Sequence, residues 1–222
     1  MEHLEHKKEK RNERAAIQLG LFLVGLLLFG TAAGGQLTGE EKNGKEKAAI
    51  QTSGGVSDAV EPKKIALTFD DGPHPVYTKI LLDGLAERGA KASFFVTGEN
   101  AEKYPELILR MQKEGHLIGN HTYHHVEITR VPDETAQEEI LMTNEVITGI
   151  TGEEVSYMRP PFGVWQKNLE RKLDVMPVLW TIDPLDWTTD NEDEIINKVV
   201  TQAGENDIIL LHDCYLSSVK AA

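Results

Sequence analysis

From Lys63 onward, short apolar runs typical of β-strands alternate with longer segments that have helical periodicity. The predicted strands are Ile65–Phe69, Ala92–Thr97, His116–Ile118, Val155–Met158, Val175–Ile182 and Asp207–His212. The predicted helices are Val76–Arg88, Ala101–Glu114, Pro132–Gly149, Gln166–Lys172 and Glu192–Ala203. This alternation favours an α/β domain with a mostly parallel sheet, either doubly wound or closed as a barrel.

Composition narrows the class of protein further. The chain has 222 residues, of which 40% are hydrophobic, so a single domain with a sizeable core can form. Its formal net charge of -13, with no basic cluster in the body, argues against a nucleic-acid-binding protein. The single cysteine, Cys214, excludes an intramolecular disulfide framework.

Residues 1–62 predict that the rest of the chain is exported across the cell membrane. Residues 1–14 are polar and are predicted to stay cytoplasmic, because several of them are basic. Residues 15–35 contain no charge and are long enough to span a bilayer, either as an anchor or as a signal peptide cleaved near Thr31–Gly34. The length of the apolar run favours the anchor. Residues 36–62 are polar and aperiodic, which predicts a flexible linker that places the domain 63–222 outside the cell membrane.

The end of the sequence predicts an incomplete element. After the strand that ends at His212, Ser217 and Ser218 are typical helix N-cap residues, and the four residues that follow would form only a first helical turn. A lone turn is unstable without packing, so we expect the domain to be truncated at its C-terminal end.

Ionisable residues follow five of the six predicted strands at their carboxyl ends, where α/β domains place their sites. These groups lie in Asp70-Asp71, His121–His125, Arg159–Gly163, Asp183–Trp187 and Leu210–Asp213. Side chains of adjacent strand residues point to opposite faces, so Asp70 and Asp71 can serve one site only if the chain turns. The Gly72-Pro73 break supplies that turn.

The histidines of the second group suggest a metal site. His121 and His125 are four residues apart, and on a helical turn they would share one face, while His124 is a rival ligand. Two histidines and one carboxylate leave coordination positions open for water and substrate, which is a catalytic arrangement. The same ligand set serves non-haem iron oxygenases, but here the carboxylate lies about fifty residues earlier in an α/β chain, which disfavours that class.

Five segments occur in a characteristic order: TFDDG (68–72), HTYHH (121–125), RPPFG (159–163), DPLDW (183–187) and LLHD (210–213). Together they resemble the motifs of the polysaccharide deacetylase family, also called the NodB-homology or carbohydrate esterase family 4 domain. The resemblance covers residues 63–222. It implies a distorted (β/α) barrel and metal-dependent removal of acetyl groups from sugars.

The resemblance also implies a role for each matching residue. Asp71, His121 and His125 would bind a divalent metal ion, zinc first, with cobalt or manganese as alternatives. Asp70 would be the catalytic base, ion-paired with Arg159, and His212 the general acid, with either Asp183 or Asp186 fixing its charge. Trp187 and Leu210 would line the pocket for the acetyl methyl group. Phe162, also expected to contact the substrate, stands where the family commonly has tyrosine, and a backbone N–H of the RPPFG stretch could stabilise the oxyanion.

Several of these residues also have a purely structural alternative. Arg159 could be a surface arginine, Trp187 and His212 could belong to the core, and one of the two aspartates 183 and 186 could be a turn residue.

The sequence therefore predicts a membrane-tethered or secreted, monomeric, metal-dependent N-deacetylase. Its expected substrate is a polymer that contains N-acetylglucosamine, either peptidoglycan or chitin-type. The alternatives are O-deacetylation of an acetylated xylan-like polysaccharide and a non-catalytic, carbohydrate-binding relic.

Overall fold

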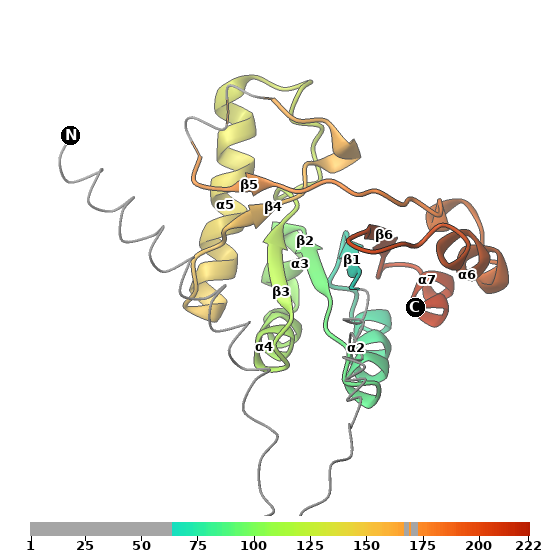
Figure 1. The fold of residues 1–222 in the computed structure, drawn as a ribbon. Helices are drawn as coiled ribbons and strands as arrows, with labels where there is room; N and C mark the ends of the chain where they lie inside the picture. The colour runs from blue at the N-terminus through green and yellow to red at the C-terminus, as the bar shows by residue number, and fades with distance from the viewer. Residues whose placement is uncertain (1–63, 167–168, 170–172) are drawn as a thin grey trace, which may run out of the picture. The chain divides into compact units, whose positions relative to one another are not determined.

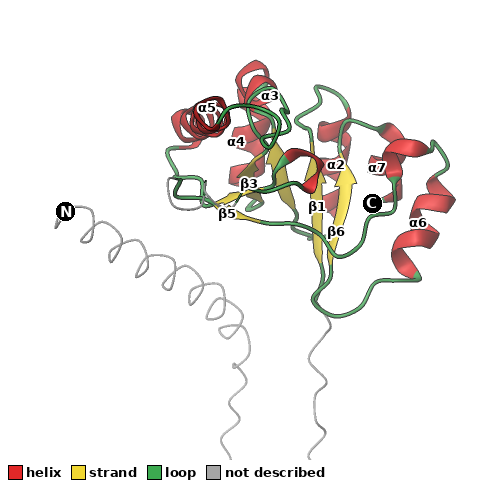
Figure 2. Ribbon diagram, turned by 90° about the horizontal axis from the view of Figure 1, so that it is seen from above, coloured by secondary structure: helices red, strands yellow, loops and turns green. Residues whose placement is uncertain are grey.

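The computed structural model describes residues 64–166, 169 and 173–222, which all belong to one compact unit, Asp58–Ala222. Six parallel strands form one sheet in the order β5-β4-β3-β2-β1-β6. The strands are β1 (Ala66–Asp70), β2 (Ser93–Val96), β3 (Leu117–Asn120), β4 (Tyr157–Met158), β5 (Met176–Pro177) and β6 (Ile208–His212). The sheet is curled into a half-barrel, as Figures 1 and 2 show.

Helices follow one another along the outer side of this curved sheet (Figure 2). They are α2 (Tyr77–Glu87), α3 (Gly98–Lys103), α4 (Pro105–Lys113), α5 (Asp133–Thr151), α6 (Glu192–Val200) and α7 (Leu216–Ala221). Two short 3-10 helices, η1 (Pro161–Gly163) and η2 (Asp186–Thr188), lie in loops that follow strands β4 and β5. The predicted α/β class with a parallel sheet is therefore confirmed.

Strand periodicity separates the apolar core from the site. Phe69 of β1, Phe94 of β2 and Ile209 of β6 belong to the main apolar core, which also contains residues of α2 and α4. The intervening side chains, such as Asp70 and His212, point to the opposite, concave face of the sheet. Asp70 and His212 are register partners on β1 and β6, so the fold brings their two side chains to the same place.

The segment Val178–Ile182 joins the two edges of the half-barrel. Val178 donates its N–H to the carbonyl of Met158 in β4, while Ile182 forms an isolated parallel bridge with Ile209 in β6. The strand predicted over Val175–Ile182 is therefore wrong in length. Only Met176–Pro177 forms a regular ladder, and the rest crosses from one edge to the other.

Two helix predictions also need correction. The helix predicted over Ala101–Glu114 is two helices, α3 and α4, which meet at Tyr104 (φ −131°, ψ 56°) because the residue before a proline disfavours helical angles. The last helix begins at Leu216, with Tyr215 at its N-cap position. The predicted cap residues Ser217 and Ser218 therefore lie inside the helix, where they are buried.

Some predictions fall outside the described residues. These are the membrane segment 15–35, the linker 36–62 and most of the helix Gln166–Lys172. Within the part of the chain that the structure describes, no helix is both long and apolar enough to cross a membrane.

Candidate active site

The two adjacent aspartates are separated by a left-handed turn at Asp71 itself. Asp70 is the last residue of β1 and is buried, and Asp71 has a φ of 73°, a conformation that aspartate tolerates better than most residues. The carbonyl of Asp71 accepts a hydrogen bond of 2.9 Å from the side chain of Asn100, which holds this turn. Both carboxylates thus reach the same site. The sequence predicted the turn one residue later, at Gly72-Pro73.

Asp71, His121 and His125 form a group that could hold a metal ion. Oδ1 of Asp71 lies 3.3 Å from Nε2 of His121 and 3.3 Å from Nε2 of His125. The potential ligand atoms all lie within 4.8 Å of one another. Among the described residues, Oδ1 of Asp71 is buried and has no hydrogen-bond partner.

The hydrogen bonding of His121 explains why this group suits a cation. Its Nδ1 lies 2.7 Å from the carbonyl oxygen of Arg159, to which it can only donate, so the neutral ring presents a lone pair at Nε2. That lone pair faces the carboxylate of Asp71, and two acceptors at this distance need a cation or a proton between them. Burial raises the pKa of Asp71, but when a proton rather than a metal ion lies between it and His121, that contact and the positive charges of the neighbouring histidines outweigh burial and lower the pKa to about 2. A carboxylate, two imidazoles and open positions fit a divalent ion such as zinc.

The loop that carries the two histidines is not the helical turn expected from their spacing. Thr122 and His125 both have left-handed backbone angles, with φ of 61° and 57°. This winding, rather than a helical repeat, brings His121 and His125 together. His124, the rival ligand, instead lies with its Nδ1 2.7 Å from Oε1 of Glu139.

Arg159 orients Asp70 from inside the half-barrel. Its Nη1 donates to Oδ1 of Asp70 at 2.7 Å and to Thr68 at 2.8 Å, and its guanidinium carbon lies 4.3 Å from the centre of the Phe95 ring. Arg159 has no exposed surface, so it is not a surface arginine. Burial raises the pKa of Asp70, although the charges of His121 and Arg159 oppose the rise. The arginine therefore aligns the carboxylate, while burial makes it a better proton acceptor than an exposed aspartate.

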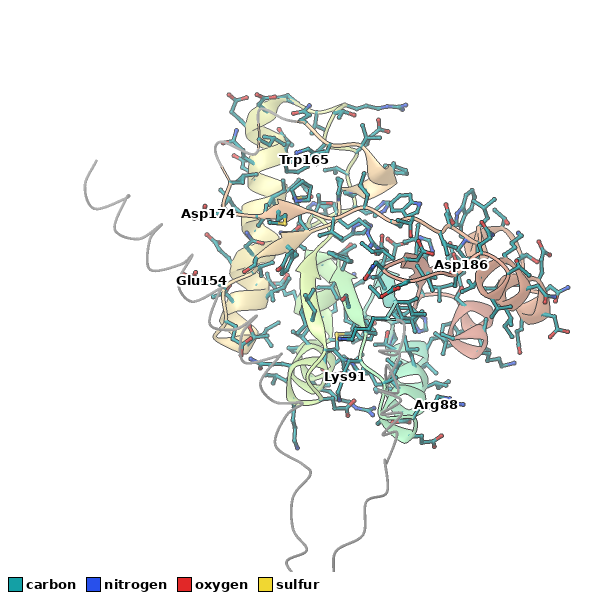
Figure 3. All side chains as sticks on the ribbon, in the orientation of Figure 1. Arg88, Lys91, Glu154, Trp165, Asp174 and Asp186 are labelled. Carbon is teal, nitrogen blue, oxygen red and sulfur yellow. The ribbon has the colours of Figure 1, made fainter. Side chains whose placement is uncertain are left out.

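Asp186 is the aspartate that partners His212. Its Oδ1 lies 2.8 Å from Nδ1 of His212, and its Oδ2 accepts the backbone N–H of His212 at 2.8 Å. Figure 3 labels Asp186 on the segment before α6. Burial lowers the pKa of His212, but the hydrogen bond and charge of Asp186 outweigh this and raise it to about 9. His212 is therefore a protonated imidazole at neutral pH, with Nε2 as its remaining donor.

Asp183 has a different, local role. Its Oδ1 accepts the backbone N–H of Leu185 at 2.8 Å, a hydrogen bond within a turn. Leu185 is left-handed, with a φ of 57°. The two aspartates that the sequence could not separate are thus a turn residue, Asp183, and a partner of His212, Asp186.

The three apolar candidates lie in different environments. Leu210 is buried on the same face of β6 as His212. Phe162 is exposed and left-handed, and its ring centre lies 5.0 Å from that of His125. Trp187 is 54% exposed, so the alternative that it belongs to the core is wrong. Its place in a pocket with Leu210 stays a prediction.

Only one backbone donor of the RPPFG segment suits an oxyanion. Pro160 and Pro161 have no N–H, the N–H of Arg159 bonds to the carbonyl of Asn120 at 2.8 Å, and that of Gly163 bonds to the carbonyl of Pro160 at 3.0 Å. This leaves the N–H of Phe162 as the candidate.

Sequence reasoning missed two buried acids beside the site. Asp213 is fully buried; Thr78 donates to its Oδ2, and burial raises its pKa to about 7. A Cβ atom on Gly72 would lie 2.2 Å from Oδ1 of Asp213, so the turn after Asp71 packs directly on this carboxyl group. Glu139 of α5 supports the histidine loop. The only sequence signal for it is an acidic residue at a core-facing helix position.

A parallel half-barrel with a carboxylate–histidine group, a second buried carboxylate and a buried imidazole–carboxylate pair at its strand ends is the arrangement expected of an α/β hydrolytic enzyme. The sequence profile described as polysaccharide deacetylase matches residues 57–178. The chain belongs to the polysaccharide deacetylase family, whose members are carbohydrate esterases of family 4.

Two curated relatives and one solved structure illustrate the likeness. Peptidoglycan-N-acetylmuramic acid deacetylase PdaC of Bacillus subtilis is 40% identical over 167 residues, which are 74% of this chain and 36% of that protein. Peptidoglycan-N-acetylglucosamine deacetylase of Bacillus cereus is 38% identical over 152 residues, which are 67% of this chain and 55% of that protein. The solved structure of PdaC superimposes with a TM-score of 0.71 at 40% identity and covers 72% of this chain and 80% of that one. The chain thus spans only 36% and 55% of these relatives' lengths.

Proposed function

We propose that this chain is a metal-dependent deacetylase that removes N-acetyl groups from amino sugars of peptidoglycan. The observation that carries the proposal is the unpartnered Oδ1 of Asp71 between the Nε2 atoms of two histidines, among the residues that the structure describes. On either side of this group lie a buried carboxylate aligned by Arg159 and an imidazole aligned by Asp186.

Asp71, His121 and His125 would hold the metal ion. A divalent ion bound there acidifies water and polarises the acetyl carbonyl group. Zinc suits a set of two imidazoles and one carboxylate, and cobalt and manganese are the alternatives.

Asp70 and His212 divide the proton transfers. Asp70 accepts a proton from the water that attacks the acetyl carbon, and its raised pKa improves it as a base. His212, with a pKa of about 9, donates its Nε2 proton to the sugar nitrogen as the carbon–nitrogen bond breaks. The products are acetate and a free amino sugar. The N–H of Phe162 would stabilise the oxyanion.

The substrate is proposed from the relatives' names. One is named for N-acetylmuramic acid and the other for N-acetylglucosamine, so either sugar of peptidoglycan is a candidate. The sequence analysis predicted N-acetylglucosamine as the sugar that is deacetylated and did not predict N-acetylmuramic acid. A chitin-type oligomer and an O-acetylated xylan are the alternatives for the assay. The relic hypothesis is disfavoured, because every position of the metal, base and acid groups is filled.

Extracytoplasmic action is part of the proposal. The uncharged residues 15–35 and the polar residues 36–62 support a domain tethered outside the membrane, where cell-wall polymer lies. Protease treatment of intact cells tests this, because only an exported domain is degraded.

The test of the activity is acetate release from four substrates. These are peptidoglycan, peptidoglycan whose muramic acid units already lack their N-acetyl groups, chitooligomers and acetylxylan. We expect release from peptidoglycan that stops on chelation and in Asp70→Asn, and that continues in the control Asp190→Asn, which changes an aspartate outside the proposed site. No acetate from any of the four by the zinc-loaded protein would refute the proposal.

A further inference from the structure

The loop between the two metal-ligand histidines is held in an unfavourable backbone conformation. Thr122 and His125 are both left-handed, and neither is glycine. Side chains with a Cβ atom disfavour this region, so the loop needs bonds from outside to persist. Two helices supply these bonds. At the start of α3, Gly98 and Glu99 donate their backbone N–H groups to the carbonyls of Thr122 at 3.0 Å and Tyr123 at 3.1 Å. Helix α5 supplies side-chain bonds to the loop.

Glu139 of α5 supplies three of the bonds. It is 7% exposed, and its Oε2 accepts the backbone N–H of Tyr123 at 3.0 Å and that of His124 at 2.8 Å. Its Oε1 lies 2.7 Å from Nδ1 of His124. All three contacts fall between the two ligand histidines.

Only a carboxylate suits this position. Three donors converge on one side chain, and an ionised carboxylate accepts on both oxygens, whereas an amide accepts on one only. A buried acid without such partners would be costly, so the loop and Glu139 stabilise each other.

The start of the loop is tied to the same helix through Asn120. Its Oδ1 accepts the N–H of Thr122 at 2.7 Å, and its Nδ2 donates to the carbonyl of Ile140 at 2.7 Å. Helix α5 thereby fixes both the first residue after His121 and the two residues before His125.

We propose that Glu139 is a positioning residue that holds the His121–His125 loop wound so that both Nε2 atoms face Oδ1 of Asp71. It thereby sets the affinity of the site for its metal ion. In this arrangement His124 braces the loop through Glu139 and is not a ligand. The inference rests on the metal site of the proposed function.

The experiment measures the dissociation constant of Zn²⁺ for the full-length chain by competition with a chromophoric chelator. Glu139→Gln keeps the size of the side chain but only one acceptor, and Glu139→Ala removes both. Outer-shell contacts of this kind change metal affinity by about 10- to 100-fold, and we expect a loss in this range for both variants. The visible absorption of bound Co²⁺ should change as well, because the ligand geometry changes.

Matched controls separate positioning from general stability. Glu138→Gln changes the neighbour on the same helix, and Ile147→Val weakens the core face of α5 away from the loop. Both should bind Zn²⁺ as the unchanged chain does.

An affinity loss below about fivefold in Glu139→Gln would overturn the inference, and so would an equal loss in Ile147→Val. If Glu139→Ala does not fold, the Zn²⁺ affinity of Glu139→Gln alone tests the inference. The assay contains no sugar, so a failure of this inference is distinct from a failure of the deacetylase proposal, which the acetate assay measures.

Discussion

Replacing Asp186 by asparagine should remove the charge that keeps His212 protonated. The structure raises the pKa of His212 from 6.5 to about 9, against the effect of burial, chiefly through the hydrogen bond and charge of Asp186. A shift of this size corresponds to about 3 kcal/mol of preference for the protonated imidazole. His212 is largely buried and Asp186 is 1% exposed, so water screens the interaction between their charges only weakly.

The size of the pKa shift of His212 determines how the loss of acetate release in Asp186→Asn depends on pH. With a pKa of about 9, about 90% of His212 is protonated at pH 8, whereas with a pKa of 6.5 only about 3% is. The variant should therefore lose at least about thirtyfold in acetate release at pH 8, and clearly less at pH 6. The alkaline limb of the pH profile should move from about pH 9 to below 7.

The assay is acetate release from peptidoglycan between pH 5 and 10, together with an NMR titration of the His212 ring. Asp183→Asn is the matched control, because Asp183 bonds to the N–H of Leu185 and should leave the profile in place. An unchanged alkaline limb in Asp186→Asn, or a loss of equal size at every pH, would refute the reasoning.

Two further predictions concern the stability of the domain. Gly72→Ala should destabilise the fold by about 1–3 kcal/mol or more, because its Cβ atom would lie 2.2 Å from Oδ1 of Asp213; chemical denaturation measures this. Gly149→Ala is the control, since a Cβ atom there meets nothing within 4 Å, and an equal loss in both would contradict the prediction. Burial, and secondly the charge of Lys91, lower the pKa of His116, so below about pH 6.5 the unfolded chain binds a proton that the folded chain does not. The stability advantage of the chain over His116→Asn should therefore shrink between pH 7.5 and 5.5, and an advantage that does not change with pH would show that the histidine is not held neutral.

The central strands and the residues at their ends could be predicted well from the sequence, because they depend on local patterns. Apolar runs define β1 and β6, and parallel strands bring their carboxyl ends to one edge, so the sequence alone places Asp70 and His212 at the same edge. The structure adds that the two residues are register partners. The order of five short motifs predicted that the chain belongs to the polysaccharide deacetylase family, and the profile match confirms this prediction.

Features that depend on tertiary contacts could not be predicted. Asp183 and Asp186 are equivalent by spacing, and only the distance from Asp186 to His212 separates them. The left-handed winding of the histidine loop depends on distant partners, such as Glu139 of helix α5, which lies 16 residues from Tyr123 in the sequence. By contrast, the break at Pro105 had a local signal, since proline at the start of a helix is common and its predecessor is rarely helical.

Metal titration tests the central claim most directly. The chelated chain is mixed with increasing Zn²⁺, and acetate release from peptidoglycan is measured after each addition. We predict that release is absent without metal, rises with each addition and reaches its plateau at one ion per chain. Acetate release at the same rate without metal, or a plateau that does not depend on Asp71, His121 and His125, would contradict the account.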